Sequence, residues 1–192
     1  FEELDEEITE NEIRHAIKHL KRGKSHGLDN IINEYFIEFS DSLIPLLNTL
    51  FNKIFSSGIF PKAWSNCVIV PIFKKGDAND PNNYRGISLM SCFCKLFTSI
   101  LNNRLIEWSS TNNIISDVQF GFQPNLSAVD AIFSLHSLIT KFTQSRKKLY
   151  CCFIDYKKAF DSIIRSNLWI KIKHYGIHGK LLSIIQSMYS DI

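Results

Sequence analysis

The chain has 192 residues, of which 45% are hydrophobic and 15 are phenylalanine. This is enough apolar side chain for one sizeable core, and it excludes a disordered polypeptide. No apolar run approaches the ~20 residues that span a bilayer, so no membrane partner is expected. Residues 1–12 carry seven acids and no base, whereas residues 13–192 carry 22 bases against 12 acids, a net charge of +10. A basic body of this size favours a polyanionic partner, nucleic acid first.

The ends of the chain indicate whether it is part of a longer protein, and its cysteines indicate the redox environment. The chain starts on Phe and ends in a helical pattern, so we expect a piece of a longer protein. The cysteines are odd in number and lack His or Cys partners at zinc-site spacing. We therefore expect reduced, mostly buried thiols in an intracellular protein. The cysteines are Cys67, Cys92, Cys94, Cys151 and Cys152.

The first third of the chain predicts helices. Thr9 and Glu12 form a T-x-x-E capping box before apolar residues at helical spacing. A second helix is predicted at 31–39, and a third over 43–55 is closed by Gly58. The apolar stripe of this third helix is predicted to be core: Leu43, Leu46, Leu47, Leu50, Phe51, Ile54 and Phe55.

The basic segment KRGKSHGLDN (21–30) separates the first two predicted helices. It is either a phosphate contact or a solvated helix end, and its composition favours the solvated end.

A hairpin and further helices follow. CVIVPIF (67–73) predicts an edge strand because Pro71 has no N–H to donate. The polar stretch 74–89 reads as a long hairpin loop before a second arm at 87–90. The remaining predicted elements are a helix at 93–108, a helix capped by Ser127 and Asp130, a strand at 149–154, and helices at 162–174 and 180–190. This order indicates an α+β fold whose last strand has no obvious sheet partner in the chain.

The stretch at 151–161 is the best candidate for chemistry. Cys151 to Ile154 form a continuous apolar run, typical of a strand covered on both faces, and Asp155 follows at its end. A carboxylate in this position suits a hard cation such as Mg²⁺, although it could equally cap the next turn. Asp161 is interpreted as a cap of the helix predicted at 162.

The sequence CFIDYKKAFDSI (152–163) resembles motif A of reverse transcriptases, the RNA-directed DNA polymerases, from non-LTR, LINE-type (Jockey-like) retrotransposons. Other pieces resemble the same family in the same order and cover nearly the whole chain: GIFPKAWSNCVIVPIFKKGD (58–77), NYRGISL (83–89), KLFTSILNNRL (95–105), QFGF (119–122) and SAVDAI (127–132). The resemblance implies the fingers and first part of the palm of a right-hand polymerase at 58–192. A helical N-terminal extension at 1–57 would precede them, and the palm sheet would be incomplete.

The resemblance also implies roles for individual residues. Asp155 would be the catalytic aspartate that holds two Mg²⁺ ions, with the backbone carbonyl of Tyr156 as an additional ligand. Phe160 would be the steric gate that excludes a 2′-hydroxyl and so selects dNTPs. The partners would be an RNA template, a DNA primer and dNTP, in the nucleus or the cytoplasm.

The hairpin at 67–89 would belong to the fingers. There Arg85 and either Lys74 or Lys75 would face the triphosphate of the incoming nucleotide, and the sequence leaves the choice of lysine open.

Several positions depart from the family pattern. Gln123 and Leu126 stand where the family has arginines, which would weaken template contacts. The other departures are His26, Leu28, Asn30, Gly86 and Ala128.

The second acidic motif of the family, F/Y-A-D-D, does not occur in the chain. We therefore expect that the fragment alone does not polymerise. The alternative is a catalytically dead nucleic-acid-binding remnant of a mobile element. A phosphohydrolase with Asp155 as nucleophile ranks last, because such enzymes commonly have a second acid where Lys157 stands.

Overall fold

The structure is a computed structural model that describes residues 2–156 and 159–190. The chain divides into two compact units. Unit 1 comprises Phe1–Trp108 and Trp169–Ile192, and unit 2 comprises Ser109–Leu168. The predicted boundary between residues 57 and 58 therefore lies inside unit 1. None of the helices in the described ranges is long and apolar enough to cross a bilayer.

The first helix of unit 1, α1 (Glu10–Lys18), begins at the predicted capping box. The Thr9 N–H donates to the Glu12 carboxylate at 2.8 Å, and the Glu12 N–H donates to Thr9 Oγ1 at 3.2 Å. These bonds satisfy two of the amides that a helix start leaves without a partner. The side chains of Ile13, Ala16 and Ile17 are buried on one face of the helix, as their spacing predicts.

Helices α2 (Asn33–Glu38) and α3 (Ser40–Ser57) confirm the next two predicted helices. Gly58 ends α3 in the left-handed conformation at φ 66°, which a residue without Cβ adopts without steric cost. The predicted apolar stripe was too wide, because Leu46 and Leu50 are exposed. The buried face follows the helical period more strictly and consists of Ile44, Leu47, Phe51, Ile54 and Phe55.

An aromatic cluster joins α3 to the short helix α4 (Lys62–Ser65) and to the long helix α5 (Cys92–Thr111). The Phe51 and Phe97 rings meet edge to face with centroids 5.4 Å apart. The Trp64 ring stacks on Phe93 with centroids 6.2 Å apart. Aromatic pairs in these arrangements contribute beyond the area that they bury, so the cluster stabilises the packing of α3, α4 and α5 in unit 1.

The acidic N-terminus is part of unit 1. Asp5 ends the 3₁₀ helix η1 (Glu2–Asp5), and its carboxylate accepts the N–H groups of Lys180 and Leu181, both at 2.9 Å. These amides belong to the first turn of α8 (Gly179–Met188), where the helix dipole favours a negative charge. Gly179 has φ 70°, and a Cβ there would collide with the Asp5 carboxylate. The contact links residues 175 positions apart.

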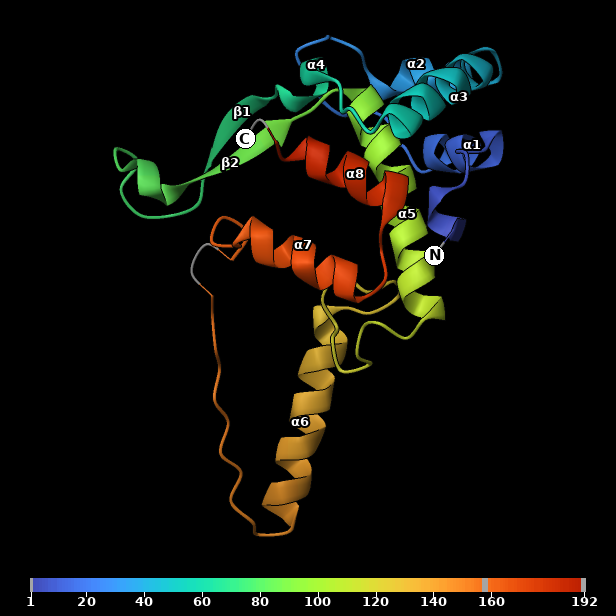
Figure 1. The fold of residues 1–192 in the computed structure, drawn as a ribbon. Helices are drawn as coiled ribbons and strands as arrows, with labels where there is room; N and C mark the ends of the chain where they lie inside the picture. The colour runs from blue at the N-terminus through green and yellow to red at the C-terminus, as the bar shows by residue number, and fades with distance from the viewer. Residues whose placement is uncertain (1, 157–158, 191–192) are drawn as a thin grey trace. The chain divides into compact units, whose positions relative to one another are not determined.

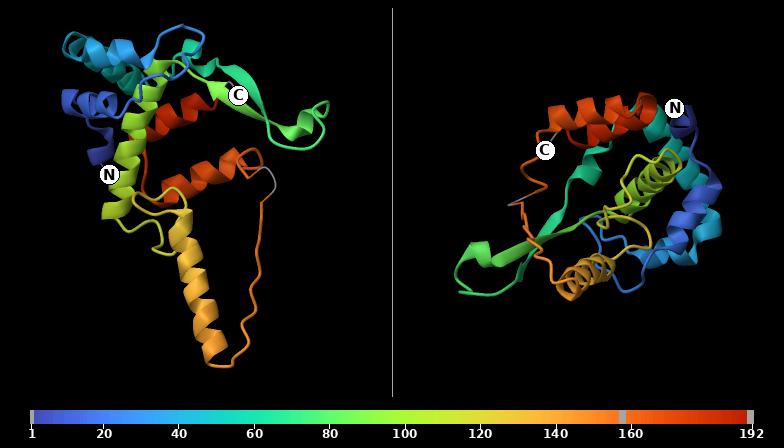
Figure 2. Two further views of the ribbon diagram at one scale, coloured as in Figure 1. Left: turned by 180° about the vertical axis from the view of Figure 1, so that it is seen from behind. Right: turned by 90° about the horizontal axis from the view of Figure 1, so that it is seen from below.

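Strands β1 (Val68–Phe73) and β2 (Tyr84–Leu89) form an antiparallel hairpin whose register runs from Val68 opposite Leu89 to Phe73 opposite Tyr84. The 3₁₀ helix η2 (Pro81–Asn83) precedes β2. The second strand therefore starts three residues before its predicted start at 87. Both strands are edges of a two-stranded sheet, which accommodates Pro71. Figures 1 and 2 show the loop end of the hairpin extending away from the helices of unit 1.

In unit 2, helix α6 (Ala128–Gln144) confirms the helix predicted from Ser127 and Asp130. The Asp130 carboxylate accepts both the N–H and the hydroxyl of Ser127, at 2.8 and 2.6 Å. Most apolar side chains of α6 are exposed, Val129, Ile132 and Phe133 among them, and none of the helix is buried. The local signals for the helix are therefore satisfied, whereas its apolar face is not covered.

The predicted strand at 149–154 is not formed. This segment is extended coil, drawn as a thin tube after α6 in Figure 1, and Phe153 is 81% exposed. A strand needs a neighbour for its N–H and C=O groups, and β1 and β2 are the only strands in the described residues and pair with each other. Cys92 and Cys94 are buried as predicted, but Cys151 and Cys152 are exposed.

The last two predicted helices are present as α7 (Arg165–His174) and α8. Because α7 begins at Arg165, Asp161 lies four residues before it in a turn. The interpretation of Asp161 as a helix cap was therefore wrong.

Arg104 of α5 makes the most extensive set of polar contacts in unit 1. Its guanidinium pairs with both Glu12 carboxylate oxygens, at 2.5 and 2.9 Å. It also donates to the carbonyls of Glu6 and Glu7 at 2.7 and 2.9 Å, and it lies over the Phe55 ring. The Arg104 side chain is only 11% exposed. One side chain thus connects α5 to α1, α3 and the acidic N-terminus.

We expect Arg104→Ala to lower the free energy of unfolding by on the order of 3 kcal/mol, because it removes the charge partner of the half-buried Glu12 carboxylate and the side-chain donor to two carbonyls. Arg14→Ala is the matched control. Its ion pair with Asp41 at 2.8 Å is exposed, so the loss should stay below about 1 kcal/mol. Urea denaturation followed by circular dichroism measures both values, and equal losses would contradict the role given to Arg104.

The same pair predicts a pH dependence of stability. Burial opposes ionisation of Glu12, but hydrogen bonds from Arg104 and Thr9 and the charge of Arg104 outweigh it and hold the pKa of Glu12 below its ordinary 4.5. A carboxyl group with a lowered pKa stabilises the fold above its unfolded pKa, and this contribution is lost as the pH falls through the folded pKa. The stability difference between the native chain and Glu12→Gln should therefore shrink from pH about 6 to about 3. A difference that stays constant over this range would contradict the assignment.

Candidate functional site

Asp155 lies in unit 2 at the end of the extended segment 151–156. Its side chain and that of Tyr156 are exposed. The next two residues, 157 and 158, lie outside the described residues. The structure thus presents the Asp155 carboxylate and the Tyr156 carbonyl one after the other on an open stretch of backbone.

These two groups do not form a metal site by themselves. No three His, Cys, Asp or Glu residues in the described part of the chain are grouped so that they could hold a metal ion. Mg²⁺ takes six oxygen ligands in near-octahedral geometry and is commonly held through one or two carboxylates together with substrate phosphates and water. The residues present therefore do not fit a complete two-ion site, and Asp155 can supply only one protein carboxylate to it.

Phe160 lies in a turn five residues after Asp155 and is 76% exposed. Its ring meets the ring of Phe122 edge to face, with centroids 6.2 Å apart and an interplanar angle of 86°. Sequence reasoning identified Phe160 but gave no role to Phe122, although QFGF was recognised as a motif. The contact brings the two motifs together within unit 2.

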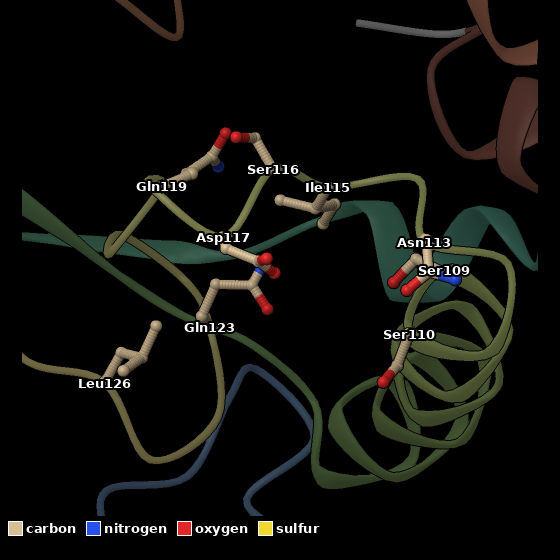
Figure 3. Close-up of a pocket in the computed structure, with 9 residues that line it drawn as sticks. All are labelled: Ser109, Ser110, Asn113, Ile115, Ser116, Asp117, Gln119, Gln123 and Leu126. Atoms are coloured by element: carbon tan, nitrogen blue, oxygen red, sulfur yellow. The ribbon is translucent and has the colours of Figure 1, made fainter.

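The end of α5 and the loop before α6 line a half-open polar cavity of about 300 Å³ (Figure 3). Gln123 and Leu126, which replace arginines of the family pattern, both line it. The Gln123 and Asp117 side chains extend into the middle of this region in Figure 3. The lining residues are Ser109, Ser110, Asn113, Ile115, Ser116, Asp117, Gln119, Gln123 and Leu126. Since Asp117 is the one charged residue among them, the cavity does not attract anions.

The cationic candidates lie on the hairpin of unit 1, where Lys74, Lys75 and Arg85 are all exposed. Arg85 is in β2 opposite Ile72, and the Lys74 N–H donates to the Asn83 carbonyl at 2.8 Å. One backbone hydrogen bond therefore follows the last ladder pair, Phe73–Tyr84.

Side chains alternate between the two faces of a strand. This alternation decides which lysine lies on the same face of the hairpin as Arg85. Lys74 lies two positions after Ile72, so it shares the face of Ile72 and Arg85. Phe73 and Tyr84 occupy the other face, where their ring centroids are 5.4 Å apart. Lys75 follows at a bend, outside the ladder. The hairpin thus groups Lys74, rather than Lys75, with Arg85.

The sequence profile of the family described as reverse transcriptase (RNA-dependent DNA polymerase) matches residues 72–192. The chain belongs to the reverse transcriptase family. The matched region contains every residue assigned a role by resemblance: Lys74, Lys75, Arg85, Asp155, Tyr156 and Phe160. The helices and the small antiparallel sheet of the chain agree with the α+β fold class.

Relatives of this reverse transcriptase chain come from mobile elements. The probable RNA-directed DNA polymerase from transposon BS of Drosophila melanogaster is 33% identical over 177 residues, which cover 88% of the chain and 20% of that protein. The RNA-directed DNA polymerase from mobile element jockey of the same species is 26% identical, covering 86% of the chain and 18% of the relative. The transposon TX1 149 kDa protein of Xenopus laevis is 26% identical, covering 99% and 14%. The chain thus spans about a fifth or less of the relatives that it matches.

Proposed function

We propose that the chain forms the fingers and the first part of the palm of an RNA-directed DNA polymerase of a non-LTR mobile element. Residues 58–192 would make these parts, and the helical residues 1–57 would precede them. The observation that carries the proposal is the family match over 72–192, a range that contains Asp155 and the segment that resembles motif A. The net +10 of residues 13–192 suits the proposed partners, an RNA template and a DNA primer.

In this proposal Asp155 and the Tyr156 carbonyl would be ligands for the divalent ions that reverse transcriptases use. The expected ion is Mg²⁺, because it prefers oxygen ligands. When bound, such ions would offset the charge of the phosphates and make the attacking hydroxyl more acidic. The remaining carboxylates are not supplied by the described residues. Phe160 would exclude the 2′-hydroxyl of a ribonucleotide and so favour dNTPs.

The extended segment 149–156 would become a strand of the palm sheet in the complete polymerase domain. Its run of apolar side chains from Cys151 to Ile154 is typical of a strand buried on both faces. In this structure the same side chains are exposed. The exposed apolar face of α6 in the same unit is a second surface that packing in the complete domain would cover.

The second candidate function is a nucleic-acid-binding remnant without activity. It is favoured by Gln123 and Leu126, which put neutral side chains where the family carries arginines. The two candidates differ in one property, because only the polymerase can extend a primer.

Primer extension on an RNA template with Mg²⁺ tests the proposal. We expect residues 1–192 alone to give no extension, and a chimera that carries them in place of the matched segment of the transposon BS relative to extend the primer. Asp155→Asn in the chimera should lower kcat by about 10³-fold or more, because it removes a charged metal ligand. Asp161→Asn, an exposed acid six residues away, is the control and should stay near the native rate.

Primer extension by residues 1–192 alone would contradict the proposal that the chain lacks carboxylates that the metal site requires. Full activity of Asp155→Asn would contradict its role. A chimera that binds template and primer but never extends, while the unmodified transposon BS protein does, would favour the remnant.

The hairpin geometry predicts which lysine contacts the triphosphate. In the chimera, Lys74→Ala should raise KM for dNTP about tenfold, the effect of losing one charge-assisted contact. Lys75→Ala removes the same charge one residue away and should change KM by less than about threefold. Steady-state kinetics measures both, and a larger effect of Lys75→Ala would reverse the assignment.

A further inference from the structure

Phe122 has a backbone conformation that its residue type rarely adopts. Its φ is 63°, in the left-handed region that favours glycine or asparagine, and it lies in the turn of QFGF. A bulky side chain held there is strained and persists when something else in the protein requires it. Burial does not compensate for the strain, because Phe122 is 87% exposed.

The ring contact of Phe122 is with Phe160. The centroid separation of 6.2 Å and the angle of 86° are those of an edge-to-face aromatic pair, in which a positive ring edge meets a negative face. Phe160 is itself exposed and lies in a turn, so its own surroundings do little to fix its ring. Two exposed aromatic side chains from separate motifs thus hold each other within unit 2.

We infer that Phe122 is a positioning residue that holds the ring of Phe160 in the orientation needed to discriminate between deoxyribose and ribose. The inference rests on the proposed role of Phe160 as the steric gate. A gate discriminates only if its ring cannot rotate away when a 2′-hydroxyl approaches. The left-handed turn at Phe122 directs a second ring against it and limits that rotation.

Substitution of Phe122 by glycine distinguishes the effect of the aromatic ring from the effect of the backbone conformation. Phe122→Gly removes the ring but keeps, and relaxes, the left-handed conformation, since glycine adopts it without penalty. Phe122→Tyr keeps an aromatic ring at the same place and is the rescue variant. Phe133→Ala removes another exposed phenylalanine of unit 2, on α6, and is the control.

The first experiment uses residues 1–192 and NMR of selectively labelled phenylalanine rings. We expect a cross-peak between the Phe122 and Phe160 ring protons, and a change of the Phe160 ring resonances in Phe122→Gly but not in Phe133→Ala. Lack of the cross-peak, or Phe160 resonances that Phe122→Gly leaves unchanged, would overturn the inference without any assay of activity.

The second experiment measures the ratio of kcat/KM for dNTP to that for rNTP in the chimera. Phe122→Gly should lower the ratio about two- to tenfold, the factor that one edge-to-face aromatic pair supplies. Most of the change should come from faster use of rNTP, whereas kcat for dNTP stays near the native value. Phe122→Tyr should restore the ratio, and Phe133→Ala should leave it unchanged. A general loss of structure would instead lower both rates together.

Phe160→Ala distinguishes the two ways in which the account can fail. If it leaves the ratio unchanged, Phe160 is not the gate, and both that part of the proposed function and this inference are overturned. If Phe160→Ala lowers the ratio but Phe122→Gly does not, the gate stands and only the inference about Phe122 is overturned.

Discussion

The Arg104–Glu12 ion pair is the interaction on which the helical unit depends. Arg104 is nearly buried, and its donors are used by the Glu12 carboxylate and by backbone carbonyls of the acidic N-terminus. A charged group in this position is tolerated only when it is fully paired. Two of the seven acids in residues 1–12 form internal contacts through their carboxylates, because Glu12 pairs with Arg104 and Asp5 caps α8. The basic side chains of the hairpin are exposed.

A second constraint, backbone pairing, governs the candidate site. The segment 149–156 has the composition of a buried strand but is exposed coil in this structure. A strand gains stability from neighbours on both sides, and apolar residues alone cannot replace them. Asp155 therefore lies on an exposed segment without strand pairing, whereas the Phe160 ring contacts a ring from another motif. Both observations fit the proposal that the site is one part of a larger polymerase centre.

Local signals in the sequence predicted local structure well. The capping box of Thr9 and Glu12 places the start of α1 correctly, because its hydrogen bonds connect residues three positions apart. The prediction of a strand at 149–154 was wrong, because formation of a strand depends on pairing partners that the local sequence does not encode. Asp155 was found through a motif, and its exposure could not be predicted. Phe122 was missed because its role depends on a backbone angle and on a contact 38 residues away.

We expect residues 149–156 to form a palm strand, with Asp155 at its end, once the rest of the polymerase domain is present. Hydrogen exchange of the backbone amides of this segment tests it most directly, in residues 1–192 alone and in the chimera with the transposon BS protein. We expect fast exchange in the chain alone and strong protection in the chimera, because strand pairing slows exchange. Protection already present in the chain alone, or fast exchange in both, would contradict it.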